Sequence, residues 1–337
     1  MGSGYINCNI SKKTYSAFNA IVDDSLTEVT ADMLDGITSI SSYAFYQCAN
    51  LTSVVIPSGV TSIGEYAFSS CNALTSANIP SGVTTIGTYT FSNCRALTSV
   101  TIPNSVTRIG DHAFASCSAL TSVTIPNGVT SIGTYTFSNC RALTSVTIPN
   151  SVTRIGDHAF ASCSALTSVN IPNGVTLIDE ASFYYCTSLT SITIPSTVTR
   201  IWTSAFAGCK ALTSIDIPSG VTYIGQTAFT SCSALASVTI PSSVTSIGRQ
   251  AFTSCSALAS VTIKDGATGI GDYVFNWCSR LESVTVEATT PPTLGTNAFD
   301  GTHADLVIYV PAESVDAYKS ATNWSTYASK IQAIPST

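Results

Sequence analysis

Cysteine is the residue type whose spacing most suggests chemistry in this chain. Eleven cysteines recur every 23 residues from Cys48 to Cys278, and only Cys8 lies outside the series. Disulfides are common in exported chains, but parallel Cβ vectors about 5 Å apart on neighbouring coils suit them poorly. A metal array would need clustered ligands with C-x-x-C spacing, which is absent. We therefore predict buried free thiols that pack as small apolar groups and no metal site, with disulfides and metal binding as the less favoured alternatives.

Histidine could supply acid–base or metal chemistry, and two of the three histidines follow an aspartate. His112 and His158 lie two intervals apart, which is about 10 Å if each interval advances by one strand spacing, so one ion could not bind both. Tyr66, Tyr89 and Tyr135 occupy the same position in other intervals. We interpret this column as a surface stripe copied by duplication, with an aromatic contact strip as the alternative.

Signatures of catalysis are absent from the sequence. It contains no G-x-S-x-G, no H-E-x-x-H, no P-loop and no dinucleotide fingerprint, and these are the motifs that most often reveal an enzyme. The acidic residues form no recurring pair, and the third histidine, His303, lies near the C-terminus, so no triad is visible. We predict that the protein is not an enzyme and uses no cofactor.

Serine and threonine form two regular columns. The residue two positions after each repeated Leu is Ser in every interval, and the residue two positions further is usually Thr. In a strand both would face outward together. The columns can reflect β propensity and small size alone, or they can form a neutral hydroxyl-rich groove that docks a partner. On the second interpretation the ligand-binding residues are Ser99, Thr101, Ser122, Thr124, Ser145, Thr147, Ser168, Asn170, Ser191, Thr193, Ser214 and Asp216.

Positive charge also recurs in two short columns, one of Arg108, Arg154 and Arg200 and the other of Arg95, Arg141 and Lys210. These side chains could pair with an acidic partner, but we interpret them as solvated edge charges that keep the array soluble. Charged residues are only 9% of the chain and the net charge is −6, without a basic run. A nucleic-acid partner is therefore not expected.

A 23-residue repeat places all of these columns. One unit reads C-x-A-L-T-S-V-T-I-P-x-x-V-T-x-I-G-x-x-A-F-x-x, and residues 86–123 recur unchanged at 132–169. Alternation before the Pro predicts a short strand whose Val and Ile face inward, and the Pro ends it. V-T-x-I predicts a second segment, extended or 3₁₀-like, and the Gly after it marks a turn. The A-F-x-x-C-x-x-L spacing then predicts one or two turns of helix.

The unit L-T-S-V-T-I-P-x-x-V-T-x-I-G-x-x-A-F-x-x-C resembles the BspA-like leucine-rich repeats of bacterial and protist surface proteins. Eleven units match, over about residues 37–290, and the segment from Ile308 to Trp324 resembles the closing segment common in that family. The resemblance implies a secreted or surface-anchored protein used in adhesion or recognition of host or matrix components. It fixes the scaffold better than the ligand.

The expected fold class is α/β, a right-handed leucine-rich-repeat solenoid with a parallel strand ladder on its concave face and short helical or 3₁₀ turns on its convex face. Residues 1–34 are predicted to form an N-terminal cap, and residues 35–290 about eleven repeats. Residues 291–337 are predicted to form a C-terminal cap with a strand at 306–310 and an amphipathic helix at 313–331. This cap would cover the last open strand edge, a site of aggregation otherwise.

These features predict a non-catalytic, secreted or cell-surface protein that binds host or matrix protein or glycan through its concave Ser/Thr face. A structural spacer and an ice- or lattice-binding Thr ladder are the alternative functions. No stretch approaches the ~20 apolar residues that span a bilayer, so no transmembrane segment is expected. Self-association of these charge-poor repeats stays open.

Overall fold

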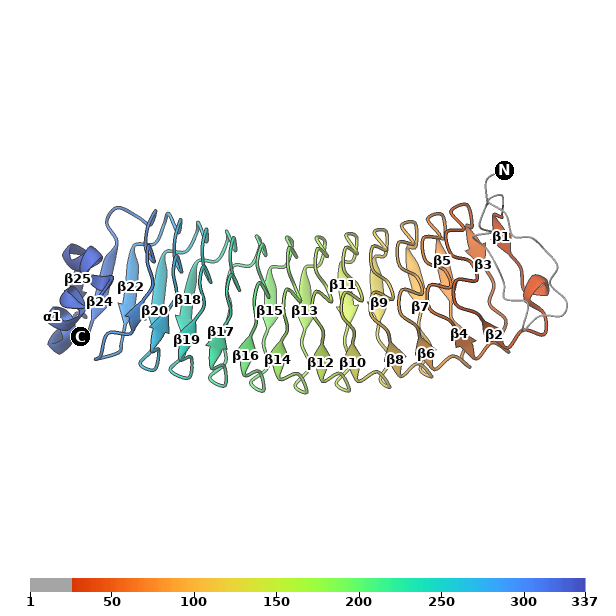
Figure 1. Ribbon diagram of the computed structural model, residues 1–337, viewed down its shortest axis with the longest axis horizontal. Helices are drawn as coiled ribbons and strands as arrows, with labels where there is room; N and C mark the ends of the chain where they lie inside the picture. Colours follow the sequence, from red (N-terminus) through yellow and green to blue (C-terminus); the bar gives the residue numbers. More distant parts are fainter. Residues whose placement is uncertain (1–25, 337) are drawn as a thin grey trace, which may run out of the picture. The chain divides into compact units, whose positions relative to one another are not determined.

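The structure of the protein is a computed structural model that describes residues 26–336. The chain divides into two compact units, Met1–Gly174 and Val175–Thr337. Each unit is a stack of coils, and every coil contributes short strands to parallel columns (Figure 1). The predicted parallel-strand solenoid is therefore confirmed in each unit.

The first unit contains two columns of strands, and a 3₁₀ turn at Asp32–Leu34 lies between its first two strands. The strand-A column of this unit lies on the face that carries the Ser and Thr columns and consists of β1 (Glu28–Val29), β3 (Ser53–Val54), β5 (Ser76–Asn78), β7 (Ser99–Thr101), β9 (Ser122–Thr124), β11 (Ser145–Thr147) and β13 (Ser168–Asn170). The strand-B column is one continuous six-stranded parallel sheet of β2 (Ser39–Ile40), β4 (Ser62–Ile63), β6 (Thr85–Ile86), β8 (Arg108–Ile109), β10 (Ser131–Ile132) and β12 (Arg154–Ile155). The V-T-x-I segment is thus an extended strand, one of its two predicted forms.

The second unit repeats this arrangement. Its strand-A column contains β15 (Ser191–Thr193), β18 (Ser237–Ile240), β20 (Ser260–Ile263), β22 (Ser283–Val286), β24 (Val307–Val310) and β25 (Ile331–Ala333). Its strand-B column is the six-stranded sheet of β14 (Leu177–Ile178), β16 (Arg200–Ile201), β17 (Tyr223–Ile224), β19 (Ser246–Ile247), β21 (Gly269–Ile270) and β23 (Thr293–Leu294).

Strand pairing follows the 23-residue repeat, so like residues face like residues. Ile132 pairs with Ile109 in the strand-B column, and Ser145 pairs with Ser122 in the strand-A column. Each position of the repeat therefore becomes a column of one residue type running along the stack. Phenylalanine shows this most clearly: in the first unit the rings from Phe45 to Phe160 stack with centroids 5.1–5.5 Å apart and are fully buried.

The inward residues of the strand-A column are mostly buried, as predicted. Val123 and Ile125 are 4% and 2% exposed. Val100 and Val146, the equivalent residues in adjacent coils, are only half-buried. The burial of this core, with the Leu, Phe and Cys columns behind it, is the main stabilising contribution to each unit.

The segment predicted as a short helix is a series of separate tight turns. In the coil that contains Phe114, amide hydrogen bonds span three residues, from Ala113 to Gly110 and from Cys117 to Phe114. Each turn contains one residue in a left-handed backbone conformation, His112 in the first and Ser116 in the second, with φ of 56° and 61°. A continuous helix cannot pass through such residues, so the bonds are of the 3₁₀ kind but the helix never propagates.

The same left-handed residues orient every second backbone N–H of the turn toward the next coil, where it donates a hydrogen bond to a carbonyl. The N–H groups of Tyr89, Phe91 and Asn93 donate to carbonyls 22 residues further along the chain, at 2.7–3.0 Å. This makes a third column of inter-coil hydrogen bonds beside the two strand columns. The turn backbone is thereby satisfied without a helix, as buried backbone groups require.

The C-terminal cap differs from its prediction in one element. The strand expected at 306–310 is present as β24, but the expected single helix at 313–331 is divided into a 3₁₀ turn (Ala312–Ser314), α1 (Val315–Ser320) and a 3₁₀ segment (Trp324–Lys330). Asn323, with φ of 65°, breaks the helix between them, and Ile331 begins β25, which pairs with β24. Tyr318 and Trp324 are nevertheless fully buried, as an amphipathic cap requires.

Candidate functional site

The predicted binding residues lie on the exposed side of the strand-A column. We call Ser99, Thr101, Ser122, Thr124, Ser145, Thr147, Ser168 and Asn170 the Ser/Thr face of the first unit, and every one of them is exposed. Strand alternation turns these side chains outward because their neighbours, such as Val123 and Ile125, point into the core. The predicted orientation of these side chains is what the structure shows.

The exposed hydroxyls of this face are not used by the fold in the part of the chain that the structure describes. Among the described residues, no hydrogen bond engages the hydroxyls of Ser122, Thr124, Ser145 or Thr147. A neighbouring threonine column behaves in the opposite way. Thr98 and Thr144 are also exposed, but their hydroxyls donate to backbone carbonyls of the preceding coil at 3.0 and 3.1 Å. Exposure alone therefore does not make a hydroxyl available to a ligand, because many exposed hydroxyls already bond the preceding coil.

The second unit departs from the prediction at two residues. Ser191 and Thr193 lie in β15 and are exposed, as expected. Ser214 and Asp216 are exposed too, but residues 212–217 form no strand, so the strand prediction is wrong for this coil. Asp216 lines a pocket of about 730 Å³ with a mixed polar and apolar lining, which also includes Thr239 and the ion pair in which Lys264 Nζ lies 2.7 Å from Glu287 Oε1.

The tyrosine and histidine stripe is a stack of rings. In the first unit Tyr43, Tyr66, Tyr89, His112, Tyr135 and His158 stack face to face, with centroids 4.3–4.7 Å apart and planes within 16° of parallel. Mutual stacking covers the ring faces inside the stripe, so a partner would meet mainly ring edges; Tyr43, the first ring, is 51% exposed. The two histidines are separated by Tyr135 and do not come together.

The two stacked histidines lie in partly buried surroundings. Burial lowers the pKa of His112, and the carboxylate of Asp111 opposes that shift only in part. His158 Nδ1 is buried without a hydrogen-bond partner. Among the residues that the structure describes, neither histidine bonds a nucleophile or joins a group of metal ligands.

The cysteine column is structural. Ten cysteines from Cys71 to Cys278 are free and buried, which confirms the prediction for them, whereas Cys48 is disulfide-bonded. The Cys94 thiol donates to the carbonyl of Phe68 in the preceding coil at 3.1 Å. Burial raises the pKa of Cys140 to about 12, so the neutral thiol persists at physiological pH.

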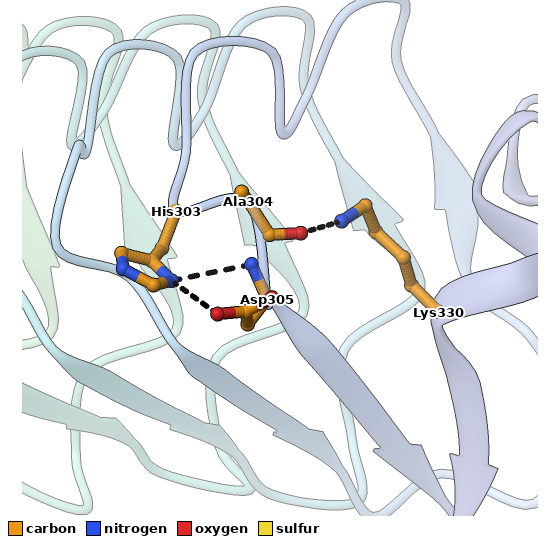
Figure 2. Close-up of polar contacts among 4 residues, drawn as sticks. All are labelled: His303, Ala304, Asp305 and Lys330. Carbon is orange, nitrogen blue, oxygen red and sulfur yellow. Dashed lines mark hydrogen bonds and ion pairs between the residues drawn. The ribbon is translucent and has the colours of Figure 1, made fainter.

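The third histidine belongs to a hydrogen-bonded loop of the cap (Figure 2). The Asp305 amide donates to His303 Nδ1 at 3.2 Å, and Lys330 Nζ donates to the carbonyl of Ala304 at 2.7 Å. Asp305 Oδ2 lies 3.9 Å from the same Nδ1. Because Nδ1 accepts a backbone N–H, this pair fixes the loop before β24, and no described serine hydroxyl bonds to His303.

The sequence did not predict a pocket that the structure shows in the first unit. It lies on the segments that precede strands β7, β9 and β11. Its volume is about 390 Å³ and its lining is wholly polar: Asn93, Arg95, Ser116, Ser118, Asn139 and Arg141. The alternation of Arg, Ser and Arg at positions 95, 118 and 141 was visible in the sequence. That signal was missed because single solvated charges explain an arginine column equally well.

Within residues 26–336, no group of three or more histidine, cysteine or acidic side chains is placed to hold a metal ion. Over the same described range, the helices are all too short or too polar to span a bilayer.

The sequence matches a family model described as BspA type leucine-rich repeat region, over residues 10–141, 84–213 and 200–321. These overlapping matches span most of the chain. No curated protein matches it significantly in sequence.

Solved structures give the same architecture. A leucine-rich repeat protein from Bacteroides ovatus is 29% identical, covers 89% of this chain and 88% of its own, and has a TM-score of 0.63. A leucine-rich cell surface protein from Faecalibacterium prausnitzii is 34% identical, with coverage of 81% and 82% and a TM-score of 0.56. The pneumococcal vaccine antigen PcpA is 19% identical, with coverage of 89% and 77% and a TM-score of 0.57, which indicates a shared fold alone.

Proposed function

Because the chain belongs to the BspA-type leucine-rich repeat family, we propose that it is a non-catalytic recognition protein, secreted or held at a cell surface. Its Ser/Thr face binds a host or matrix protein or glycan. The description of the F. prausnitzii relative as a cell surface protein supports this location.

The observation that carries the proposal is the contrast between two sets of exposed hydroxyls. Thr98 and Thr144 use theirs to bond the preceding coil, whereas Thr124 and Thr147 leave theirs unused on the strand surface. A ligand that meets this face can form hydrogen bonds without displacing any intramolecular bond, and the short side chains lose little entropy on binding.

The test is binding of the purified chain to a panel of matrix proteins, glycans and cultured cells, beside a Thr124→Lys/Thr147→Lys variant. Both positions are exposed on adjacent strands, so the variant changes the face without changing the core. We expect the variant to lose about tenfold or more in affinity, since two desolvated lysines would replace small neutral contacts.

The matched control is Thr107→Lys/Thr130→Lys, which makes the same charge change at exposed positions on adjacent coils outside the Ser/Thr face. Equal losses in the two variants would reject the face as the site and indicate a nonspecific charge effect. Absence of binding by the unmodified chain would favour the spacer function.

The lattice-binding alternative is tested separately by a thermal-hysteresis assay. Asn170 and Asp216 interrupt the threonine column, and Asp216 lies outside any strand. We therefore expect no thermal hysteresis, and measurable activity would overturn the recognition proposal in favour of lattice binding.

A further inference from the structure

The polar pocket between Arg95 and Arg141 of the first unit has the features of an anion site. Both arginines are exposed, and neither forms an ion pair within the described part of the chain. They are unpaired cations in a chain whose net charge is −6. Arginine presents a rigid donor fork that binds carboxylate and sulfate oxygens in bidentate geometry.

The pocket exists because a small residue separates two large ones. Arg95 and Arg141 occupy the same repeat position two coils apart, and the coil between them carries Ser118 there. Two coil spacings place the arginine backbones about 10 Å apart. The gap above Ser118 leaves a hollow of about 390 Å³ with a cation on each side.

The other lining groups are neutral hydrogen-bonding side chains. The amides of Asn93 and Asn139 donate to the adjacent Ser92 and Ser138 hydroxyls at 3.4 and 3.2 Å, which orients them and leaves their carbonyl oxygens as acceptors. The Ser116 hydroxyl has no partner among the residues that the structure describes. No apolar side chain lines the pocket, so it offers nothing to seat the apolar groups of a peptide.

We propose that this pocket binds an acidic oligosaccharide, with carboxylate or sulfate-ester groups held by Arg95 and Arg141 and sugar hydroxyls bonded by the asparagine and serine side chains. Two anionic groups on a hydroxyl-rich scaffold match two guanidinium groups separated by neutral donors and acceptors. The pocket residues are not part of the Ser/Thr face, so this inference stands apart from the proposed function.

The test measures binding of four probes to the purified full chain by titration calorimetry at low salt. The probes are a heparin-derived tetrasaccharide, tetragalacturonate, neutral maltotetraose and a tetraglutamate peptide. We expect one or both acidic oligosaccharides to bind, maltotetraose not to bind, and added salt to weaken the interaction because the charges are exposed. The first two probes distinguish sulfate from carboxylate as the preferred group.

The variant Arg95→Gln/Arg141→Gln should weaken acidic-oligosaccharide binding by about tenfold or more, since each lost charge-assisted contact is among the stronger hydrogen bonds. The matched control Arg108→Gln/Arg154→Gln removes the same charge from the same two duplicated coils outside the pocket. If the ligand is held by contacts in the pocket and not by the electrostatic potential of the whole protein, the control should change affinity by less than about twofold.

Three outcomes overturn the proposal: no binding of either acidic oligosaccharide, equal binding of maltotetraose, or an equal loss in the control variant. If tetraglutamate is the one probe that binds, the first outcome applies and the result indicates an acidic peptide as ligand. The Thr124→Lys/Thr147→Lys variant should bind the acidic oligosaccharide at least as well as the unmodified chain. Failure of this inference is therefore distinguishable from failure of the Ser/Thr face.

Discussion

Some polar side chains in this protein bond a neighbouring coil, and others face solvent without such a bond. The Cys94 thiol and the Thr98 hydroxyl both donate to carbonyls of the preceding coil, at 3.1 and 3.0 Å. Their roles differ in burial, because the cysteine is wholly enclosed and the threonine is exposed. Whether a polar side chain is available to a ligand therefore depends on its hydrogen-bond partner as well as on its exposure.

Burial of the cysteine column predicts unreactive thiols. Burial raises the pKa of Cys140 to about 12 and that of Cys232 to about 12, so the reactive thiolate is scarce near neutral pH. We expect iodoacetamide at pH 8 to leave the ten free cysteines of the described residues unmodified in the native protein and to alkylate them after unfolding in urea. Rapid alkylation of the native protein, measured by intact mass, would contradict the buried column.

The lowered pKa of His112 predicts a loss of stability in acid. Burial lowers the pKa in the folded state below the value of about 6.5 expected in the unfolded chain. The unfolded state therefore binds the proton more readily, so stability falls as the pH decreases from about 6.5 toward the folded-state pKa. Above pH 6.5 the residue is neutral in both states and makes no pH-dependent contribution.

The variant His112→Tyr should lose less stability than the unmodified chain between pH 7.5 and pH 5, because it lacks this titration. Tyrosine occupies the same position in the two adjacent coils, at Tyr89 and Tyr135, so the stack accepts it. Urea unfolding at both pH values measures the difference. Identical pH profiles for the two proteins would show that His112 titrates as an ordinary exposed histidine.

At the scale of one element, the turn that follows the strand-B column determines how closely coils can stack. A Cβ added to Gly110 would lie 2.8 Å from the Thr88 nitrogen and 2.9 Å from the Gly87 carbonyl carbon. Both are backbone atoms of the preceding coil and cannot rotate away. Glycine is therefore required here for close approach of two backbones, not for an unusual φ.

We expect Gly110→Ala to destabilise the protein by about 1–3 kcal/mol, the usual cost of overpacking. Gly59→Ala is the control, because its added Cβ would meet nothing closer than the Ile37 carbonyl oxygen at 3.6 Å. Chemical denaturation of both variants checks the difference. A loss as large for Gly59→Ala would mean that coil spacing is not the cause.

At the scale of the whole molecule, a stack of coils needs a covered end. In the second unit Trp324 is fully buried, and its indole N–H donates to the carbonyl of Pro292 at 2.8 Å. Tyr318 donates to the carbonyl of Ala288 at 2.8 Å beside it. These hydrogen bonds hold the cap against the end of the Phe column. The ring centroids of Trp324 and Phe299, the last ring of that column, are 6.1 Å apart.

Trp324→Ala should destabilise the protein by about 3–5 kcal/mol and promote self-association, because the last coils lose their cover. Trp277→Ala is the matched control: Trp277 is 65% exposed, and its removal should change stability by no more than about 0.5 kcal/mol. Denaturant unfolding and light scattering after size exclusion measure both effects. A stable monomeric Trp324→Ala protein would show that the cap is dispensable.

Much of the repeat architecture could be predicted from the sequence, because in a stack of identical units each residue contacts its equivalents one period before and after it. A 23-residue period places Ile109 beside Ile132 and Ser122 beside Ser145 once strands stack in parallel. Alternation around Val123 then decides that Ser122 and Thr124 face outward. The solenoid, its buried Phe and Cys columns and the exposure of the predicted face all follow from that period.

Only the tertiary structure decided which polar groups are available and how the turns close. The A-F-x-x-C spacing fits a helix, but left-handed residues such as His112 and Ser116 stop its propagation and direct amides to the next coil. Thr98 and Thr124 are both exposed threonines, yet among the described residues only the Thr98 hydroxyl donates to a carbonyl of another coil. The Arg95–Arg141 pocket depends on the space above Ser118. Hydrogen-bond partners and hollows arise between coils, so no single repeat can specify them.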